Sequence, residues 1–487
     1  MQGIKTGLAA LALLSFTPAA SAEVVQGALQ LRWGDPHVPE GMEVRRAPRF
    51  EAQLVLDSGE RLQLDPAEAR RGAGDLLALA NRRVAIEFSR TGGARGAGFI
   101  EAIVPADRFG APQAEHLVAG KADTTPQAVL GTTRWVSIAC RFADVGAEPR
   151  PVSFFQGQYG EAPGQLGHYW REVSYDRINL QGSTAVGWYA LPHPRSHYVT
   201  TDANTDEESV DLGALFRDCT AAADPHVDFR QVLGVNLMFN GDLDGYAWGG
   251  GECGVLDGVR SCWSTTWNPP WSFNNIAVLA HEMGHGYGLP HSDNSDGDDD
   301  TYDNPWDVMS STWHNAATNP QYGVLPKHVN IHQRDRLGWV AAARKRTVET
   351  GESPVSLLID YASLRGSGNV QMLVLRTRGA ADPYLDTVYT VEARRRSGDY
   401  EAALAGDAII IHSVGGDYSA KARSLDADVP PADVSNNEGS MFKVGETWVS
   451  PDGRLMVRVE AQTATGFRVV AGSPVRTGGN QRPGTVR

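Results

Sequence analysis

The alternation of apolar and polar residues predicts short β-strands over much of the chain. Residues 50–56 and 83–88 alternate at every second position, as expected of strands with one buried face. Residues 232–239 form an almost unbroken apolar run, which is typical of a strand buried on both faces. Further strand patterns follow near the C-terminus at 370–376, 387–393, 408–412, 455–460 and 466–470.

Helical spacing of apolar residues is confined to a few segments. Residues 164–175 and 207–224 place apolar side chains three or four positions apart, which predicts amphipathic helices. Residues 326–339 are predicted to form another helix. An apolar segment from Ile276 is also predicted to be helical, and Gly288 lets the chain leave that helix. The mixture indicates an α+β fold with β-rich segments on either side.

A chain of 487 residues is too long for one compact core, so several domains are expected. We predict a signal peptide at 1–22 and an N-terminal β-rich domain at 23–134. A central domain is predicted at 135–340 and a β-sandwich-like or barrel-like domain at 341–472. Residues 473–487, rich in Gly, Pro and Arg, are predicted to be a disordered tail.

The first 22 residues have the organisation of a secretory signal. Lys5 precedes a short apolar core at residues 8–16, and Ala20-Ser-Ala22 fits a cleavage site. That core is shorter than the roughly 20 residues needed to cross a bilayer. We therefore expect a secreted protein, extracellular or periplasmic, without a membrane span. The net charge of −14 argues against nucleic acid as a partner, and nothing in the sequence indicates the oligomeric state.

Four cysteines remain after the predicted signal, which suggests two disulfides in a secreted protein. Three pairings are possible. We favour Cys253 with Cys262, which closes a short Gly-rich loop, and Cys140 with Cys219, which closes a long one. A cysteine-ligated zinc site is disfavoured because the chain contains no C-x-x-C pair.

The segment from Ile276 carries the main chemical signal, H-E-x-x-H-x-x-G-x-x-H. On a helix, His281 and His285 are four residues apart and project from one face. Two such imidazoles can share a zinc ion, and the turned chain returns His291 as a third ligand. Glu282 stands beside the first ligand, where it can take a proton from a water molecule. Three protein ligands leave a position open, as in catalytic zinc sites.

This motif resembles that of the metzincin metallopeptidases. The resemblance implies a metzincin-like catalytic domain over 135–340, with a mixed sheet and an active-site helix. It further implies a tight turn beneath the zinc that contains Met309. The stretch from Tyr302 to Met309 and the ending Leu337-Gly-Trp339 are similar to the gametolysin and immune inhibitor A groups of secreted peptidases.

The chain also departs from that pattern. Some metzincins have a tyrosine ligand two residues after the methionine, where Ser311 stands here, so Tyr322 is the only substitute that we consider. In the metzincin fold an edge strand pairs with extended substrate. The Gly-rich segment 246–264 is a candidate for it, and the alternative is a flexible loop.

The N-terminal domain is interpreted as a propeptide, a binding module or a structural brace. Some zinc peptidases are kept inactive by a propeptide cysteine or aspartate on the metal. No cysteine precedes Cys140, so a cysteine switch is absent. Asp35 could supply a carboxylate, but a Gly-Asp pair is more typical of a turn, and we expect a turn here.

Residues 293–303 contain six carboxylates, which repel one another unless they are solvated or bound to a cation. Calcium prefers such oxygen ligands, although the spacing is not that of an EF-hand. A Ca²⁺ site and a solvated acidic loop are the two interpretations.

The sequence therefore predicts a secreted zinc endopeptidase that acts on protein or peptide substrates, with His281, His285 and His291 as ligands and Glu282 as general base. Two other classes stay open. One is a zinc hydrolase of a non-peptide substrate. The other is a non-catalytic adhesin or binding protein that keeps a metal site for stability.

Overall fold

The computed structural model describes residues 23–37, 46–89, 99–108, 126–298, 300–366, 368–379, 387–415, 421–428 and 437–474. The predicted signal peptide at 1–22 and most of the predicted tail lie outside these residues. The fold is a mixed α+β arrangement dominated by sheets, as the sequence patterns predict. Within the described ranges, no helix is long and apolar enough to cross a membrane.

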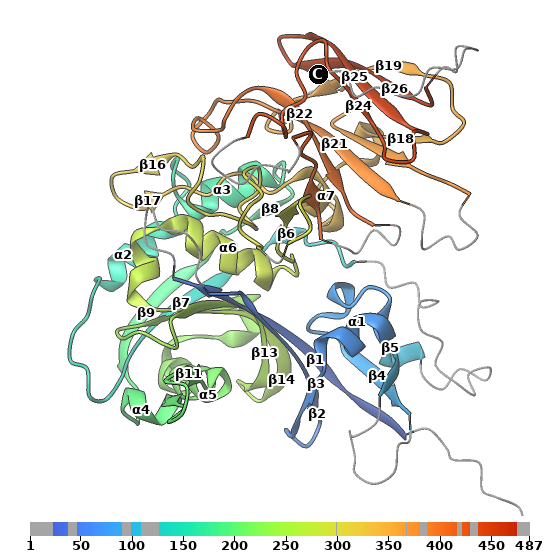
Figure 1. Ribbon diagram of the computed structural model, residues 1–487. Coiled ribbons are helices and arrows are strands. Elements are labelled where there is room, and N and C mark those ends of the chain that lie inside the picture. Colours follow the sequence, from blue (N-terminus) through green and yellow to red (C-terminus); the bar gives the residue numbers. More distant parts are fainter. Residues whose placement is uncertain are drawn as a thin grey trace, which may run out of the picture.

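One ten-stranded sheet runs through both the N-terminal and the central parts of the chain (Figure 1). Its strands, in spatial order, are β3 (Arg61–Leu64), β2 (Arg49–Leu56), β1 (Glu23–Pro36), β13 (Tyr246–Leu256), β14 (Val259–Asn268), β12 (Gly234–Phe239), β7 (Trp135–Arg141) and β9 (Thr184–Ala190), with β4 (Arg83–Phe88) and β5 (Ile100–Pro105) attached through β1. Strands β14, β12, β7 and β9 pair in parallel, whereas β13 is antiparallel to both of its neighbours. The long strand β1 therefore joins the two parts of the chain.

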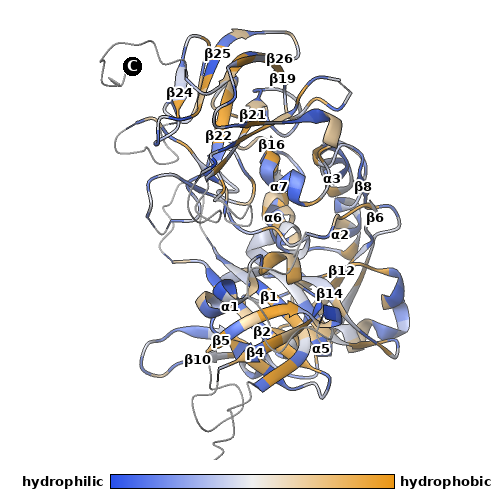
Figure 2. Ribbon diagram, turned by 90° about the vertical axis from the view of Figure 1, so that its right-hand side faces the viewer, coloured by the Kyte–Doolittle hydropathy of each residue, from blue (hydrophilic) through white to orange (hydrophobic). Residues whose placement is uncertain are grey.

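Alternation along the central strands builds a separate apolar core on each face of this sheet. Trp135 packs with α3 (Leu166–Val173) and α6 (Ile276–Gly286) on one face. Ile138 points to the other face, where it packs with α5 (Leu212–Ala223). Figure 2 shows hydrophobic residues concentrated along the strands, for example in β1 and β2. Helix α6 is thus held against the sheet by its own apolar side chains.

Two predicted helices are shorter than the sequence pattern indicates. The segment 207–224 begins as strand β11 (Glu208–Val210), and its helix starts after Asp211, whose side chain accepts a hydrogen bond from a first-turn backbone N–H. The segment 326–339 is helical only over α7 (Ile331–Arg336). In both cases a capping side chain fixes the start, which apolar spacing alone does not locate.

The chain beyond residue 344 forms two further sheets around a shared apolar core. The first contains, in spatial order, β15 (Asp293–Asn294), β23 (Arg423–Ser424), β22 (Ala408–Ser413), β21 (Val388–Arg394), β20 (Met372–Arg376) and β18 (Lys345–Glu349). The second contains β19 (Val355–Asp360), β26 (Gly466–Gly472), β25 (Met456–Gln462) and β24 (Thr447–Val449). Strand β15 comes from the acidic segment after His291, so this segment is part of the C-terminal sheet.

The remaining helices and strands are short. They are α1 (Pro66–Ala73), α2 (Val152–Gln158), α4 (Arg195–Tyr198), β6 (Gly131–Thr132), β8 (Ile178–Asn179), β10 (Val199–Thr201), β16 (Thr318–Asn319) and β17 (Gly323–Val324).

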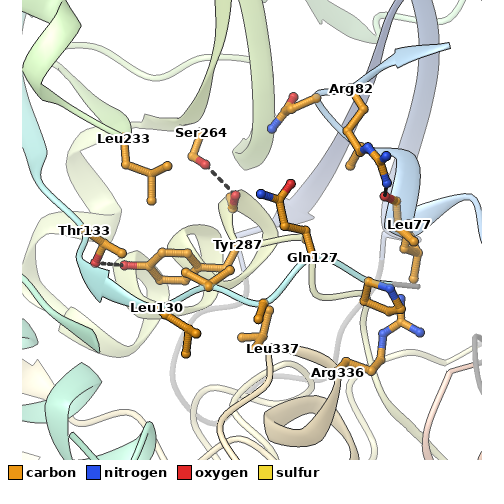
Figure 3. Close-up of a pocket in the computed structure, with 18 of the residues that line it drawn as sticks. Leu77, Arg82, Gln127, Leu130, Thr133, Leu233, Ser264, Tyr287, Arg336 and Leu337 are labelled. Carbon is orange, nitrogen blue, oxygen red and sulfur yellow. Dashed lines mark hydrogen bonds between the residues drawn. The ribbon is translucent and has the colours of Figure 1, made fainter. Parts of the chain in front are cut away.

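A cavity of about 320 Å³ lies where the N-terminal residues and the segment after residue 125 meet the end of α6 (Figure 3). Several of its polar groups already have partners, although the side-chain oxygen of Asn81 does not have one among the described residues. The Ser264 hydroxyl donates to the carbonyl of Gly286 at 2.6 Å, and the Thr133 and Tyr287 hydroxyls share a hydrogen bond of 3.0 Å. Arg336 in its wall forms an ion pair with Asp75. We therefore interpret this cavity as a packing gap between parts of the chain.

Both favoured disulfides are present. Cys140 on β7 is bonded to Cys219 on α5, and Cys253 on β13 is bonded to Cys262, its direct cross-strand neighbour on β14. The first bond ties a helix to the sheet that it covers, whereas the second lies across a hairpin that its own strand pairing already closes.

Removing the two disulfides should have unequal effects. The bonded pairs are 79 and 9 residues apart, so chain entropy predicts losses of about 4.5 and about 2.7 kcal/mol in the free energy of unfolding. We expect the variant C140A/C219A to unfold at a lower denaturant concentration than C253A/C262A, as measured by urea titration. Equal midpoints, or the reverse order, would contradict this account.

Candidate metal centre

Helix α6 and the turn after it bring the three predicted histidines together. His281 and His285 lie one turn apart on the buried face of α6. The helix ends at Gly286, and Gly288 has a φ of 89°, a value that side-chain-bearing residues rarely adopt. The reversed chain then places His291 beside the other two, with all three rings buried.

The hydrogen bonds of two rings define which nitrogens face the centre. His281 Nδ1 donates to the carbonyl of Val308 at 2.6 Å, and His285 Nδ1 donates to the carbonyl of Leu289 at 2.7 Å, because a carbonyl can only accept. In the neutral rings the Nε2 atoms then carry lone pairs. His285 Nε2 is 3.1 Å from the Nε2 of both His281 and His291. Converging lone pairs repel one another, and a metal cation between them removes that repulsion.

Burial keeps two of these rings neutral. It lowers the pKa of His291 to about 3, although the nearby Asp35 charge opposes the shift. The pKa of His285 is also lowered by burial. Neutral imidazole is the form that binds metal, so the donor set fits a metal ion.

A fourth group completes the centre, and the sequence prediction for it is wrong. Asp35 lies in strand β1, not in a turn, with Oδ1 at 2.7 Å from His291 Nε2. Its Oδ2 is 3.4 Å from the Nε2 of both His281 and His285. These four residues form a buried group that could hold a metal ion. The reason for the error is long-range pairing, since Asp35 lies opposite Ala247 on β13.

The residues around Asp35 fit closely against the centre. The Trp33 ring is stacked on the His285 ring, with centroids 4.7 Å apart. A Cβ on Gly34 would lie 2.9 Å from the Trp248 ring, so only glycine fits there. Burial alone would raise the pKa of Asp35, but attraction to the histidines in their protonated form, His291 first, outweighs burial and lowers that pKa well below its usual value. With neutral rings, a bound metal cation would favour the carboxylate in the same way.

Glu282 faces the same region. Its side chain is fully buried, and neither carboxylate oxygen has a hydrogen-bond partner among the residues that the structure describes. Burial, reinforced by the charge of Asp35, raises the pKa of Glu282 well above its usual value. A Cβ on Gly249 of β13 would lie 2.7 Å from Glu282 Oε2, so this glycine makes the close approach possible. A buried carboxyl without partners is typical of a functional group.

Residues 307–309 pack against helix α6 and contact the histidine centre. Met309 is buried against α6, where a Cβ on Gly284 would lie 2.4 Å from its sulfur. Ser292 N–H donates to the Met309 carbonyl at 3.0 Å, next to His291. Together with the bond from His281 to Val308, this contact fixes the orientation of the histidines.

The tyrosine at the centre is not the one that the sequence suggested. The hydroxyl of Tyr322 lies near Gln165, and its ring packs in the apolar core of the α6 face. Tyr302 instead donates a hydrogen bond of 2.5 Å to Asp35 Oδ1, and its ring contacts that of His291. No spacing rule connects Tyr302 to the histidine motif, so the sequence carried no signal for this position.

Comparisons with known proteins give no functional assignment for this chain. No protein-family model matches the chain, and no curated protein is significantly similar to it. The functional argument accordingly rests on the donor set at the three histidines, on Glu282 and on the strand that carries Asp35.

We expect the purified protein to bind one transition-metal ion per chain, measured by elemental analysis. His291→Ala should lower metal affinity by more than the roughly 10–100-fold typical of outer partners, because it removes a direct ligand. The exposed His193→Ala is the matched control and should keep full metal content. Equal metal content in both variants would rule out the site described here.

Proposed function

We propose that this protein is a zinc-dependent endopeptidase whose centre is covered by its own N-terminal strand. The proposal rests mainly on one observation: three imidazole nitrogens converge beside a buried carboxyl, Glu282, that has no partner among the described residues. A structural metal site needs ligands but does not need such a carboxyl. Imidazole donors favour zinc among the common metals.

Each residue has a role in the proposed reaction. His281, His285 and His291 would hold zinc, which when bound acts as a Lewis acid on a peptide carbonyl and on the attacking water. Glu282 takes the proton of the attacking water and delivers a proton to the leaving amine. Its position fits this role, because both carboxyl oxygens are buried beside the histidines and have no hydrogen-bond partner among the described residues.

Strand pairing favours a peptide over other substrates. Residues 32–36 of β1 pair antiparallel with 246–250 of β13, directly beside the centre. An extended polypeptide therefore fits along this edge, where backbone hydrogen bonds hold it independently of its sequence. The predicted strand within 246–264 exists as the hairpin β13–β14, and glycines permit the close approach. A glycan or a small ester could not use these backbone bonds in the same way.

The same pairing implies that the arrangement described here is latent. Residues 32–36 occupy the edge of β13 that a substrate would use, and Asp35 contacts all three histidines. A substrate can enter only after this part of β1 has left β13. The predicted domain at 23–134 would then act as an inhibitory propeptide.

A second function is favoured by Asp35 itself. Three histidines and one aspartate make four protein ligands, which is the number in closed structural zinc sites. A non-catalytic binding protein with a structural metal would need this arrangement permanently. The two functions differ in whether release of Asp35 creates activity.

Glu282→Gln should abolish peptidase activity while leaving zinc bound. We would introduce it into an Asp35→Ala background, because Asp35 otherwise blocks the centre, and measure casein hydrolysis and zinc content together. Loss of a general acid–base typically lowers the rate by about 10²–10⁴-fold. Full activity in the double variant would remove Glu282 from the mechanism. Zinc without activity in the Asp35→Ala parent would favour the structural function.

Asp35→Asn should raise the activity of the full-length chain. Losing a charge-assisted contact of about 1.5–3 kcal/mol shifts the balance between closed and open forms about tenfold to a hundredfold. Casein hydrolysis by the variant and by the wild type measures the change. The exposed Asp107→Asn in the same part of the chain is the matched control and should leave activity unchanged. An unchanged rate in Asp35→Asn would contradict latency by this carboxylate.

A further inference from the structure

The acidic segment between His291 and Met309 is wound into a tight loop. The side-chain Oδ1 atoms of Asn294, Asp296, Asp298 and Asp300 each accept a hydrogen bond from the backbone N–H two residues further on, at 2.7, 3.1, 2.7 and 2.9 Å. Carboxylate oxygens of Asp296, Asp298 and Asp303 lie within 4.8 Å of one another.

Asp303 is the unusual member of this group. Its side chain is buried, with the residue 2% exposed, whereas Asp296 and Asp298 lie at the surface. Oδ1 of Asp303 accepts a hydrogen bond of 2.7 Å from the Asn294 N–H. Its Oδ2 is buried without any hydrogen-bond partner among the described residues. Burial, reinforced by the charges of neighbouring aspartates, raises the pKa of Asp303 to about 8. A buried carboxyl oxygen that faces two other carboxylates needs either a proton or a bound cation.

Within the described part of the chain, no Lys, Arg or His side chain forms an ion pair with Asp296, Asp298 or Asp303. Lys421, the nearby lysine, is 3.2 Å from both carboxylate oxygens of Asp293 and also contacts Thr301. Asp293 is thereby neutralised and stands apart from the three-carboxylate group. Asp296, Asp298 and Asp303 instead accept hydrogen bonds from neutral groups, namely backbone N–H groups and, at Asp296, the side-chain amide of Asn294.

We propose that Asp296, Asp298 and Asp303 bind a calcium ion. All three donors are carboxylate oxygens, which suit a hard cation, and no imidazole or thiol belongs to the group, which disfavours zinc. Magnesium usually takes only one or two carboxylates and keeps several waters, whereas calcium accepts more oxygen ligands in flexible loops. This site is separate from the histidine centre and independent of the proposed peptidase activity.

The position of the loop indicates what calcium would stabilise. On one side, Tyr302 of this loop reaches Asp35 at the histidine centre. On the other, β15 pairs in parallel with β23 of the C-terminal sheet, and Ser295 Oγ accepts a hydrogen bond of 3.1 Å from the Asp426 N–H. A cation within the loop would hold both sets of contacts in place. Calcium would thus couple the C-terminal sheet to the histidine centre.

Calorimetric titration of the full-length, zinc-loaded protein with CaCl₂ tests this proposal. Glu282→Gln is included in every sample to prevent self-cleavage, so the outcome does not depend on peptidase activity. We expect one calcium ion per chain with a Kd of about 10⁻⁶–10⁻³ M, a rise in melting temperature with calcium, and a much smaller response to MgCl₂. Absence of both heat and melting shift at about 10 mM calcium, far above that range, would overturn the proposal.

Variants locate the ion. Asp303→Asn should weaken calcium binding at least tenfold, because it removes the buried ligand. Asp298 lies at the loop surface, so Asp298→Asn should also weaken calcium binding without disturbing folding. This second variant tests the site if Asp303→Asn does not fold. The exposed Glu207→Gln removes one charge elsewhere and should bind calcium normally. Unchanged affinity in Asp298→Asn would place the ion elsewhere and overturn the assignment.

Discussion

The convergence of three imidazole nitrogens inside the protein is the interaction on which the rest of the structure depends. Two rings donate through Nδ1 to backbone carbonyls, so in their neutral form their Nε2 lone pairs face one another in a buried space. A proton on one ring or a metal ion between the rings removes the repulsion between these lone pairs. The glycines that end α6, the buried Met309 and the chain reversal to His291 all serve to hold these rings in place.

Strand β1, which comes from the N-terminal part of the chain, also contacts this centre. It supplies the Asp35 carboxylate, a stacked tryptophan and a backbone that pairs with β13. Each contact is individually modest, but together they cover the histidine centre and one edge of β13. Because one short segment makes both the backbone pairing and the carboxylate contacts, release of that segment would expose the edge of β13 and the histidines at once.

The C-terminal part of the chain is connected to this centre through the acidic loop. Pairing of β15 with β23 makes the loop a strand of the C-terminal sheet, while Tyr302 at its far end contacts Asp35. The loop therefore contacts both the C-terminal sheet and the histidine centre. A cation bound by carboxylates would stiffen that connection, since each ligand on a flexible loop loses freedom when it coordinates.

Local rules were sufficient for the histidine motif. Four-residue spacing on a helix fixes the common face of His281 and His285, and a glycine in the left-handed region brings His291 back, so the sequence alone determined these positions. It also indicated most strands, because alternation is local, and it favoured the two disulfide pairs that form without excluding the other two pairings. Helix starts were less certain, since a capping side chain at Asp211 fixes the boundary more closely than the apolar pattern does.

Only the tertiary structure decided the roles of Asp35, Tyr302 and Asp303. Asp35 lies 256 residues from His291, and Tyr302 lies 267 residues from Asp35. Their meeting depends on the register between β1 and β13 and on the path of the acidic loop, and no spacing in the sequence encodes either. The burial of Asp303 among surface carboxylates likewise follows from how that loop packs on its surroundings, because identical side chains in one segment differ only in where the fold places them.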